Sequence, residues 1–296
     1  MHKILVTGIN GQVGYELLSA LAALGEVIGL TRQQLDLTQT EQIWQVLNHY
    51  QPTIIVNPAA YTAVDKAESD SATAYQVNQY APQIMAQWAA QYDALLIHYS
   101  TDYVFDGTKD SPYLEHDVTN PQSVYGRSKC LGEEAIRQAQ AKYFILRTSW
   151  VFGVHGHNFI KTILRLAKER SSLNIVADQH GAPTSAMLIA DVTAQIVRHY
   201  INNPNNNSDY GTYHVSALGQ TTWYDYACFI VQTALDNEQK LALTVQDIQP
   251  IASSSYPVPA KRPTNSRLNC DKLRLYFDLN LANWQLDVAQ VIARLK

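Results

Sequence analysis

The fold is decided by the stretch Lys3-Ile4-Leu5-Val6-Thr7-Gly8-Ile9-Asn10-Gly11-Gln12-Val13-Gly14. The apolar run Lys3–Thr7 predicts a buried strand, and helix-spaced apolar positions over Val13–Leu24 predict a helix directly after the glycines. Gly8 permits a sharp turn, Gly11 lets backbone N–H groups approach a pyrophosphate, and Gly14 lets the helix lie close to the sheet. The helix N-terminus also presents the positive end of its dipole to phosphates. We interpret the stretch as a dinucleotide site; a plain glycine turn is the alternative.

The alternation of strand and helix continues through the first half of the chain and predicts an α/β fold. Such alternation is typical of a doubly wound parallel sheet of the Rossmann type, covered by helices on both faces. Further strands are predicted at Val27–Leu30, Thr53–Asn57, Leu95–Tyr99 and Tyr143–Arg147. Further helices are predicted at Glu41–Tyr50, Ala72–Tyr92 and about Tyr125–Ala139.

After Trp150 the pattern loosens, which predicts a smaller C-terminal substrate-binding lobe. We expect the dinucleotide domain to comprise residues 1–150 plus about 183–212, and the smaller lobe about 151–182 plus 213–296. Asn202–Asn207 is predicted to be an exposed loop. Helical segments are predicted at Asn158–Glu169, at Ser185–Tyr200 and, as short pieces, over Asp271–Leu295.

Composition excludes several classes of protein. The 296 residues are 46% hydrophobic and 16% charged, which is enough to bury a core and argues against disorder. A formal net charge of -4 gives no broad basic surface, so we expect no nucleic-acid partner. Neither a signal peptide nor a membrane span is indicated. Three scattered cysteines, Cys130, Cys228 and Cys270, suggest neither a disulfide framework nor a zinc site, and a cytoplasmic location fits them best.

The residues after the second predicted strand bear on the choice of cofactor. An NAD site commonly carries an acid there to bind the ribose diol, but this chain reads Leu30-Thr31-Arg32. Thr31 is an expected cofactor contact. Arg32 is suited to the 2′-phosphate of NADP, which favours NADPH, with NADH possible; a solvated surface arginine is the alternative. Asp36-Leu37 follows and is expected to flank the adenine, unless Asp36 only caps the backbone before Thr38.

Other cofactor contacts are expected at the ends of the third and fourth predicted strands. Small residues after the third strand let a cofactor pass close to the backbone. The expected contacts there are Ala60, Tyr61 and Thr62, with Tyr99 on the next strand.

Three residues combine a phenol, an ammonium and a hydroxyl; a structural tyrosine–lysine pair, which this spacing produces by chance in many helices, is the alternative. Tyr125 and Lys129 are four apart on a predicted helix, so both side chains lie on one helix face. A free tyrosine has a pKa of about 10, and a neighbouring ammonium favours its phenolate, so we expect Lys129 to lower the pKa of Tyr125. Thr101, near the end of a buried strand, is placed to hydrogen-bond a carbonyl and orient it beside the tyrosine.

The order of these features resembles the short-chain dehydrogenase/reductase family, and more closely the dTDP-4-dehydrorhamnose reductases. The latter resemblance runs nearly end to end. It is carried by Gly11-Gln12-Val13-Gly14, Ala63-Val64-Asp65-Lys66-Ala67-Glu68, Ser100-Thr101-Asp102-Tyr103-Val104-Phe105, Val124-Tyr125-Gly126, Arg147-Thr148-Ser149-Trp150-Val151, Asn158-Phe159, Asp178-Gln179-His180-Gly181-Ala182-Pro183-Thr184 and Arg262-Pro263-Thr264-Asn265-Ser266-Arg267-Leu268.

The resemblance implies NADPH-dependent reduction of the C4 ketone of dTDP-4-dehydro-L-rhamnose to dTDP-L-rhamnose, a precursor of cell-surface polysaccharides such as O-antigen. It implies that Tyr125 is the acid or base, that Lys129 also contacts the nicotinamide ribose, and that Thr101 assists. The implied cofactor contacts include Gln12 and Val13 of the glycine stretch. The implied sugar-pocket residues are Val64, Thr101, Asp102, Tyr103 and Trp150.

Two further expectations concern the substrate. Trp150 offers an aromatic wall to a deoxysugar, with a buried core tryptophan as the alternative. Arg262 and Arg267 are expected to hold the substrate diphosphate, with a solvated loop as the alternative.

The sequence also bears on metal binding and leaves two rival functions open. Some relatives are said to form a dimer around Mg²⁺ with acidic side chains, one of them near the position of Met187. Methionine cannot ligate a hard cation, so we expect no metal-bridged dimer and assign no metal ligand, although Glu16 and Asp191 are acids nearby and Mg²⁺ is kept as a possible cofactor. The expected state is a monomer or a homodimer. The rival functions are a nucleotide-sugar epimerase or dehydratase of the same fold, and a non-catalytic subunit resembling the regulatory subunit of methionine adenosyltransferase.

Overall fold

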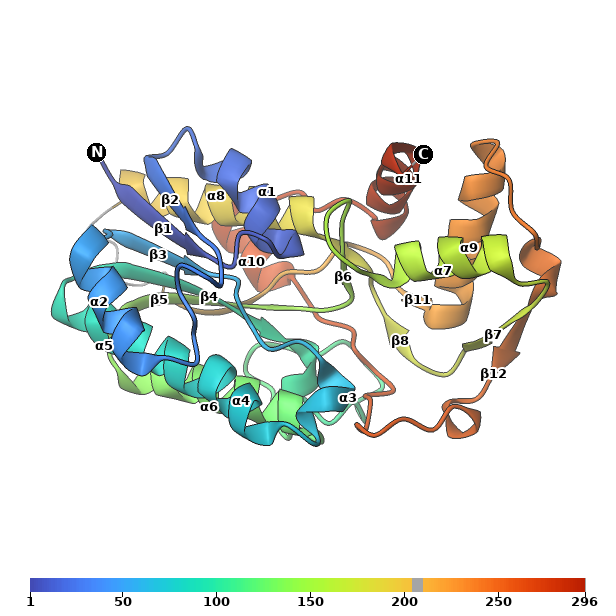
Figure 1. The fold of residues 1–296 in the computed structure, drawn as a ribbon, viewed down its shortest axis with the longest axis horizontal. Coiled ribbons are helices and arrows are strands. Elements are labelled where there is room, and N and C mark those ends of the chain that lie inside the picture. The colour runs from blue at the N-terminus through green and yellow to red at the C-terminus, as the bar shows by residue number, and fades with distance from the viewer. Residues whose placement is uncertain (204–209, 296) are drawn as a thin grey trace.

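The computed structural model describes residues 1–203 and 210–295. Figure 1 shows a larger lobe built around a sheet and, beside it, a smaller lobe made mainly from later parts of the chain. Of the loop predicted at Asn202–Asn207, residues 204–207 lie outside the described residues. Within the described ranges, no helix combines the length and the apolar character that crossing a lipid bilayer requires.

The larger lobe contains a parallel sheet of six strands in the order β2-β1-β3-β4-β5-β10. The strands are β1 (Lys3–Thr7), β2 (Glu26–Leu30), β3 (Ile54–Asn57), β4 (Leu95–Thr101), β5 (Lys142–Thr148) and β10 (Gly211–His214). The predicted doubly wound parallel sheet is therefore confirmed. The sixth strand, β10, was not predicted, because its sequence Gly-Thr-Tyr-His has no aliphatic run. The chain reverses its direction across the sheet between β1 and β3, which is where such folds bind ligands.

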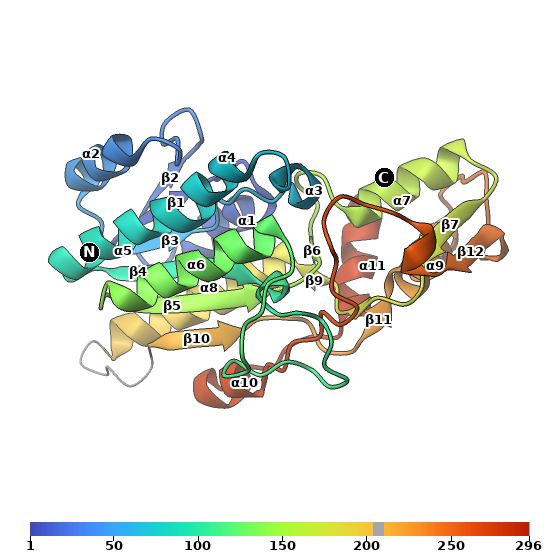
Figure 2. The same ribbon diagram turned by 90° about the horizontal axis from the view of Figure 1, so that it is seen from below.

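Helices cover both faces of the sheet because alternate strand residues point to opposite sides. Ile4 and Val6 belong to one buried cluster and Leu5 to another. On the first face lie α1 (Gln12–Leu21), α8 (Ala186–Asn202) and α10 (Asp271–Phe277), and on the second α2 (Thr40–Tyr50), α5 (Ala81–Gln91) and α6 (Val124–Gln138). Figure 2 shows α5 and α6 side by side on the second face. Each fully buried aliphatic side chain in these clusters contributes roughly 1.5–3 kcal/mol.

The helix predicted at Ala72–Tyr92 is divided into three pieces. These are α4 (Ser71–Tyr75), a π-helical turn at Gln76–Tyr80, and α5. Such turns are frequent at functional sites because they shift one side chain out of the helical register. Asn78 lies in the middle of this turn, is fully buried and faces the loop after β3. The short helix α3 (Val64–Ala67) lies between that loop and α4.

The smaller lobe has its own apolar core between three helices. They are α7 (Phe159–Glu169), α9 (Trp223–Asp236) and α11 (Trp284–Arg294), and Ile163, Ile230 and Val288 are among their buried residues. Short strand pairs edge this core. They are β6 (Val151–Phe152) with β9 (Thr184–Ser185), β7 (Leu173–Val176) with β12 (Ile248–Ile251), and β8 (His180–Gly181) with β11 (Thr221–Thr222).

The helices predicted in the second half of the chain are confirmed by α7, α8, α10 and α11. The expected division into two lobes stays a prediction. One segment bears on it: Leu273 of α10 is buried in the core of the sheet lobe, although residues 213–296 were expected in the smaller lobe.

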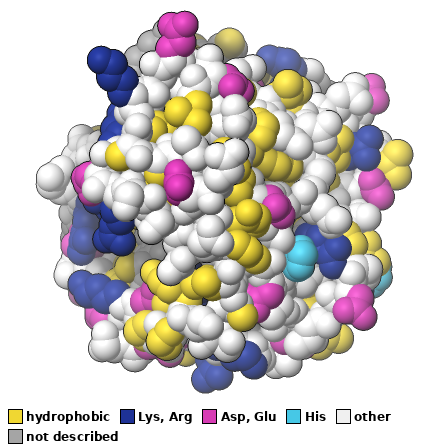
Figure 3. Space-filling view, turned by 90° about the vertical axis from the view of Figure 1, so that its right-hand side faces the viewer, with side chains coloured by type: hydrophobic (Ala, Val, Ile, Leu, Met, Phe, Trp, Pro, Cys, Tyr) yellow, Lys and Arg dark blue, Asp and Glu magenta, His cyan; other side chains and the backbone are white. Residues whose placement is uncertain are grey.

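A return segment, residues 260–268, carries the chain from the smaller lobe back to the sheet lobe (Figure 2). Asn265 donates its side-chain amide to the carbonyls of Lys109 and Ser111, at 2.6 and 2.9 Å. The backbone of Ser266 donates to the His180 carbonyl at 2.7 Å, which ties the same segment to β8. The return segment therefore joins both lobes. On the end of the molecule seen in Figure 3, acidic and basic side chains are interspersed.

Candidate active site

A cavity of about 980 Å³ opens at the carboxyl ends of the strands and is lined by residues of both lobes. It lies at the point where the strand order reverses, next to the glycine turn after β1 and the loop after β3. The predicted site residues that line it are Gly8, Gly11, Gln12, Val13, Gly14, Arg32, Asp36, Leu37, Ala60, Tyr61, Thr62, Val64, Tyr99, Thr101, Asp102, Tyr103, Tyr125, Lys129 and Trp150. Thr31, Arg262 and Arg267 do not line it.

The glycine turn has the shape that a dinucleotide phosphate requires. Gly8 has a φ of +58°, and a Cβ on Gly14 would lie 2.4 Å from the Gly8 carbonyl oxygen, so the helix packs tightly on the turn. A Cβ on Gly11 would meet only that same oxygen, at 3.2 Å, and would otherwise fill the space over the start of α1. Gly11 is thus the residue whose missing side chain leaves room for a ligand beside the helix N-terminus.

The end of β2 places one cation at the cavity. The Arg32 side chain is 79% exposed and lies 3.9 Å from the carboxylate of Asp36. Asp36 accepts hydrogen bonds from the backbone N–H and the hydroxyl of Thr38, at 3.0 and 2.9 Å, and the backbone bond lowers its pKa. The capping role considered for Asp36 is therefore present, although the residue also lines the cavity. Thr31 bonds to Gln34 instead.

The loop after β3 is fixed by the π-helical turn. Asn78 accepts a hydrogen bond from the Tyr61 backbone N–H at 2.9 Å and donates to the Tyr61 carbonyl at 3.0 Å. The same amide donates to Ser128 of α6 at 3.0 Å. Asn78 thereby links the expected cofactor loop to the helix that carries Tyr125, which is a role that the sequence did not reveal.

Thr101, Tyr125 and Asp102 meet at the base of the cavity. Thr101 ends β4, and Tyr125 lies in the first turn of α6, which Ser123 caps by accepting from the Gly126 N–H. Burial raises the pKa of Tyr125 to about 12, the Thr101 hydroxyl acts in the opposite direction, and Asp102 raises it further. The ring of Tyr125 meets that of Tyr103 edge to face, with centroids 5.5 Å apart.

Lys129 lies one turn beyond Tyr125 and is 2% exposed. Its Nζ is 2.5 Å from the carbonyl oxygen of Tyr99 and 3.0 Å from Nε2 of His98. Burial lowers its pKa to about 7, while Glu133 acts to raise it. We expected Lys129 to lower the pKa of Tyr125, and the structure does not bear this out. Burial of the phenol raises that pKa, and the lysine nitrogen bonds to Tyr99 and His98 instead.

Asp102 is 3% exposed, and its environment disfavours the carboxylate. Burial raises its pKa to about 6, although the hydroxyls of Ser266 and Thr101 bond to it and act to lower it. Burial also raises the pKa of the neighbouring Tyr103. A carboxyl and two phenols therefore offer hydrogen-bond donors as well as acceptors to a polar ligand at neutral pH.

Several known proteins that resemble this chain belong to one family of reductases. The family model described as "RmlD substrate binding domain" matches residues 1–296. The dTDP-4-dehydrorhamnose reductase of Burkholderia thailandensis is 46% identical over 287 residues, 97% of this chain and 96% of that one. That of Escherichia coli strain K12 is 44% identical over 297 residues, 99% of this chain and 98% of that one. The chain belongs to the dTDP-4-dehydrorhamnose reductase family.

Solved structures agree with this family assignment. The dTDP-4-dehydrorhamnose reductase of Bacillus anthracis, in complex with NADP, has a TM-score of 0.89 and 33% identity, with 99% of each chain covered. A UDP-glucose 4-epimerase of Thermus thermophilus has a TM-score of 0.76 at 18% identity, with 98% of each chain covered, and shares the fold alone.

An aromatic wall closes one side of the cavity in this member of the dTDP-4-dehydrorhamnose reductase family. Trp150 has a φ of +49°, which a bulky residue rarely adopts, and its ring stacks on that of Trp223 at a centroid distance of 3.6 Å. A Cβ on Gly181 would lie 2.6 Å from the Trp150 ring. Trp150 therefore lines the cavity as an aromatic wall and also packs into the apolar core of the smaller lobe. Both positions considered for it from the sequence are present.

Both arginines expected to bind the diphosphate are held by protein groups. Arg262 Nη2 donates to the Asp65 carboxylate at 2.9 Å. Arg267 donates to the side chains of Asn265 and Gln220 and to the Asp110 carbonyl, at 2.8, 2.9 and 2.6 Å. In this arrangement neither guanidinium reaches the cavity, because each is used to fasten the return segment.

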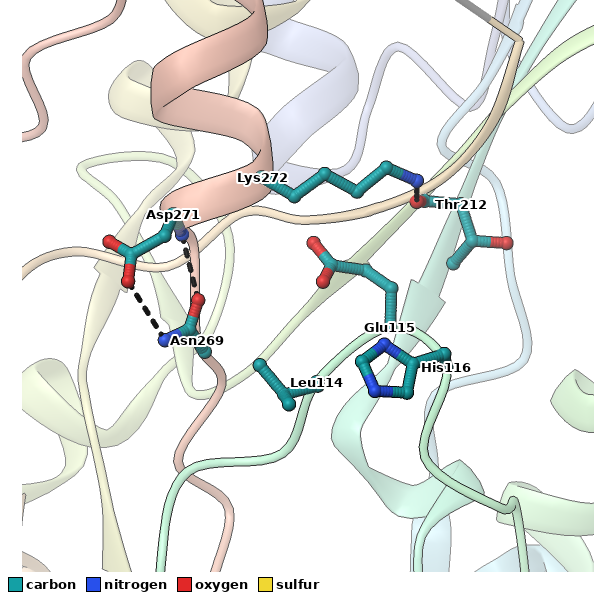
Figure 4. Close-up of a pocket in the computed structure, with 7 residues that line it drawn as sticks. All are labelled: Leu114, Glu115, His116, Thr212, Asn269, Asp271 and Lys272. Atoms are coloured by element: carbon teal, nitrogen blue, oxygen red, sulfur yellow. Dashed lines mark hydrogen bonds between the residues drawn. The ribbon is translucent and has the colours of Figure 1, made fainter.

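A second, smaller hollow of about 490 Å³ lies apart from the cavity (Figure 4). Lys272 donates to the Thr212 carbonyl at 2.7 Å, and Glu115 accepts from the His214 N–H at 3.1 Å. Its lining residues are Leu114, Glu115, His116, Thr212, Asn269, Asp271 and Lys272, none of which lines the cavity. Because these polar groups already bond to the protein, the hollow is typical of a structural cluster.

The acidic residues considered for a metal-bridged dimer lie on two helices that pack together, α1 and α8. Glu16 lies on α1 and Asp191 on α8, with Met187 one turn before Asp191. Across residues 1–203 and 210–295, no group of three or more His, Cys, Asp or Glu side chains is arranged to hold a metal ion.

Sequence reasoning missed several residues of this reductase-family site. Trp223 and His157 line the cavity, and neither follows a motif that points to it. His98 could have been found from the sequence, because it is an ionisable residue inside the otherwise apolar strand Leu95–Tyr99.

Proposed function

We propose that the protein reduces the C4 ketone of dTDP-4-dehydro-L-rhamnose to dTDP-L-rhamnose, a precursor of cell-surface polysaccharides. The observation that carries the proposal is one cavity that joins a dinucleotide turn to Thr101, Tyr125 and Lys129, in a chain 44–46% identical to reductases of that name. The chemistry is an oxidoreduction, so the protein is an enzyme of the oxidoreductase class. We further propose that it acts in the cytoplasm, as a monomer or a homodimer.

NADPH is the proposed cofactor, and NADH a second possible one. Gly11 leaves the space for the pyrophosphate, Arg32 is the cation for the 2′-phosphate, and Tyr61 and Thr62 line the path beyond the sheet edge. A structure of the Bacillus anthracis relative contains NADP, which supports this choice. Bound NADPH supplies the hydride for the ketone carbon.

The residues of the chain handle the proton and the orientation of the ketone. Tyr125 carries a proton at neutral pH because its pKa is about 12, so it is available to protonate the oxygen that becomes a hydroxyl. The Thr101 hydroxyl, which donates to Asp102 in this structure, turns to the substrate to orient that oxygen. The ammonium form of Lys129 favours the phenolate that Tyr125 leaves. Burial excludes water and strengthens both effects.

The sugar is proposed to lie against Val64, Asp102, Tyr103 and the Trp150 wall. Trp223 supports that wall from behind. Since Arg267 is fully engaged in the return segment, we retain only Arg262 as a group for the diphosphate, and only if the bond to Asp65 opens.

The test is consumption of NADPH with dTDP-4-dehydro-L-rhamnose, generated in situ by the preceding enzymes, for wild type and for Tyr125→Phe. Turnover by wild type with a collapse of kcat in the variant is expected, because phenylalanine has no proton to give. Tightly retained oxidised cofactor without NADPH consumption would instead favour an epimerase or dehydratase. NADPH binding without turnover on any nucleotide sugar would favour the regulatory-subunit alternative.

A further inference from the structure

A row of buried polar side chains runs beneath the cavity and ends at Lys129. Its other members are Thr7 of β1, Asn57 of β3 and His98 of β4, on three neighbouring strands. The exposed fractions of these four side chains are 1%, 0%, 1% and 2%. Polar groups this deeply buried are stable only when their donors and acceptors match, so their hydrogens can be placed by following the bonds.

Each group in the row donates a hydrogen bond to the next, beginning at Thr7. The Ala59 backbone N–H donates to Thr7 Oγ1 at 3.2 Å, and the Thr7 hydroxyl donates to Asn57 Oδ1 at 2.6 Å. This fixes the amide of Asn57 with its Nδ2 toward His98, at 3.1 Å from Nδ1. An amide nitrogen can only donate, so Nδ1 of His98 is an acceptor and carries no hydrogen.

The direction continues to the lysine. Burial of the ring lowers the pKa of His98 well below its usual value, so the ring is neutral. A neutral imidazole without hydrogen on Nδ1 carries it on Nε2. Nε2 is 3.0 Å from Lys129 Nζ, and an N–H at that distance needs a lone pair to accept it. An ammonium has none, whereas an amine has one and still has hydrogens to donate to the Tyr99 carbonyl.

The charged groups around Lys129 allow an uncharged amine. Glu133, one turn along α6, is the acid that favours the ammonium. Its carboxylate is already bonded by Arg147 of β5, at 2.8 and 2.6 Å, and by Arg137 at 2.5 Å. Tyr125, one turn in the other direction, is neutral at physiological pH. The charge of the Glu133 carboxylate is therefore balanced by two guanidinium groups.

We infer that His98 is a positioning residue that donates its Nε2–H to Lys129 and so favours the uncharged amine of that lysine. The ammonium, which supports proton release from Tyr125, then forms only when a proton is taken up and the bond from His98 is given up. Reduction of the ketone is fastest on the acid side of this titration and declines as pH rises through it. The catalytic meaning rests on the proposed function, whereas the arrangement of hydrogens does not.

Two substitutions test the direction of the row without touching His98 or Lys129: the first reverses it and the second releases it. Asn57→Asp puts an acceptor where the amide donates, so His98 turns its hydrogen toward Nδ1 and Nε2 becomes an acceptor for the ammonium. Thr7→Val removes the hydroxyl that fixes the Asn57 amide, and it does so without adding a charge. Both variants are expected to move the alkaline limb of the kcat–pH profile to higher pH, Asn57→Asp by about one unit or more. Asn237→Asp, which adds the same charge at an exposed position, serves as the control.

A measurement without substrate keeps this inference separate from the proposed function. Nitrogen NMR of labelled histidine in wild type should give His98 a protonated Nε2 and a bare Nδ1. Carbon NMR of labelled lysine, with the Lys129 signal identified by its loss in Lys129→Arg, should show a higher titration midpoint in Asn57→Asp and Thr7→Val. A bare Nε2 in wild type, or an unchanged midpoint in both folded variants, overturns the inference even if the enzyme turns over. A failure of turnover with the expected NMR result refutes only the proposed reaction.

Discussion

At the scale of single residues, the cavity holds side chains whose burial costs stability. Asp102 is the plainest case, because a carboxyl with a pKa of about 6 is ionised at neutral pH in surroundings that disfavour the charge. An unfolded chain would ionise it near 3.8. The proposed function gives a reason to keep such a group, since a buried carboxyl and two phenols would present a polar surface to the sugar.

The first prediction concerns the stability of Asp102→Asn. As pH rises from about 4 to 6, the unfolded chain releases its proton before the folded one, so wild type loses stability in this window and asparagine does not. Above pH 6 the variant should be more stable by up to ~3 kcal/mol, and near pH 3.8 the difference should vanish. Thermal denaturation across this range measures it, and turnover should fall in parallel. A constant difference at all pH values would contradict the stated cause.

The second prediction concerns Arg32→Gln. Losing a guanidinium that meets the 2′-phosphate should raise the KM for NADPH about tenfold or more and leave that for NADH unchanged. Steady-state kinetics with both cofactors measures this, with the exposed Arg198→Gln as the control. Equal changes for the two cofactors would remove Arg32 from this role.

At the scale of elements, α6 is positioned by close backbone contacts on two sides. A Cβ on Gly126 would lie 2.2 Å from the Tyr103 carbonyl oxygen, and one on Gly132 would lie 2.1 Å from that of Asn78. These contacts bring the helix of Tyr125 and Lys129 against the π-helical turn and against the end of β4.

The third prediction follows for Gly132→Ala. The new methyl group meets a backbone oxygen that cannot move away, so helix and π-turn must separate at a cost of about 2–3 kcal/mol, despite the better helix propensity of alanine. Thermal or urea denaturation measures this loss. Glu134→Ala, at an exposed site of the same helix, should change stability little. Wild-type stability of Gly132→Ala would show that the two elements can slide.

The elements that the sequence predicted are those with long patterns. Val13–Leu24 and Glu41–Tyr50 show helical spacing over several turns, and the helix found in the first range ends only a few residues early, at Leu21. The π-turn at Gln76–Tyr80 leaves the apolar spacing of its helix nearly unchanged, so sequence reasoning merged it with its neighbours. Strands of two residues such as β8 and β11 carry no period at all.

At the scale of the whole molecule, the return segment ties the two lobes together. The sequence could predict the motif that carries Arg262 and Arg267 but not its bonds, because the partners Asp65 and Asp110 lie more than 150 residues away. The same limit explains Trp223, which reaches the cavity only through packing of the smaller lobe. Motif spacing brings together residues that are near in sequence or at strand ends, whereas these contacts depend on the complete fold.

The fourth prediction concerns Asn265→Ala. Removing this amide leaves the carbonyls of Lys109 and Ser111 without their donor and should cost about 3 kcal/mol. The KM for the nucleotide sugar should rise more than that for NADPH, since the cleft between the lobes loosens on the substrate side. Calorimetry and kinetics measure both, with exposed Asn237→Ala as the control. An unchanged melting temperature would show that the segment does not fasten the lobes.

The stacked rings of Trp150 and Trp223 have an optical consequence. Two indoles 3.6 Å apart and inclined by 15° are close enough to share their electronic excitations, so we expect a paired positive and negative band in ultraviolet circular dichroism if their transition dipoles are twisted against each other. One ring comes from the end of the sheet lobe and the other from the first turn of α9. A ligand that displaces Trp150 would therefore change the circular dichroism of the stacked pair, so its binding could be followed without a dye.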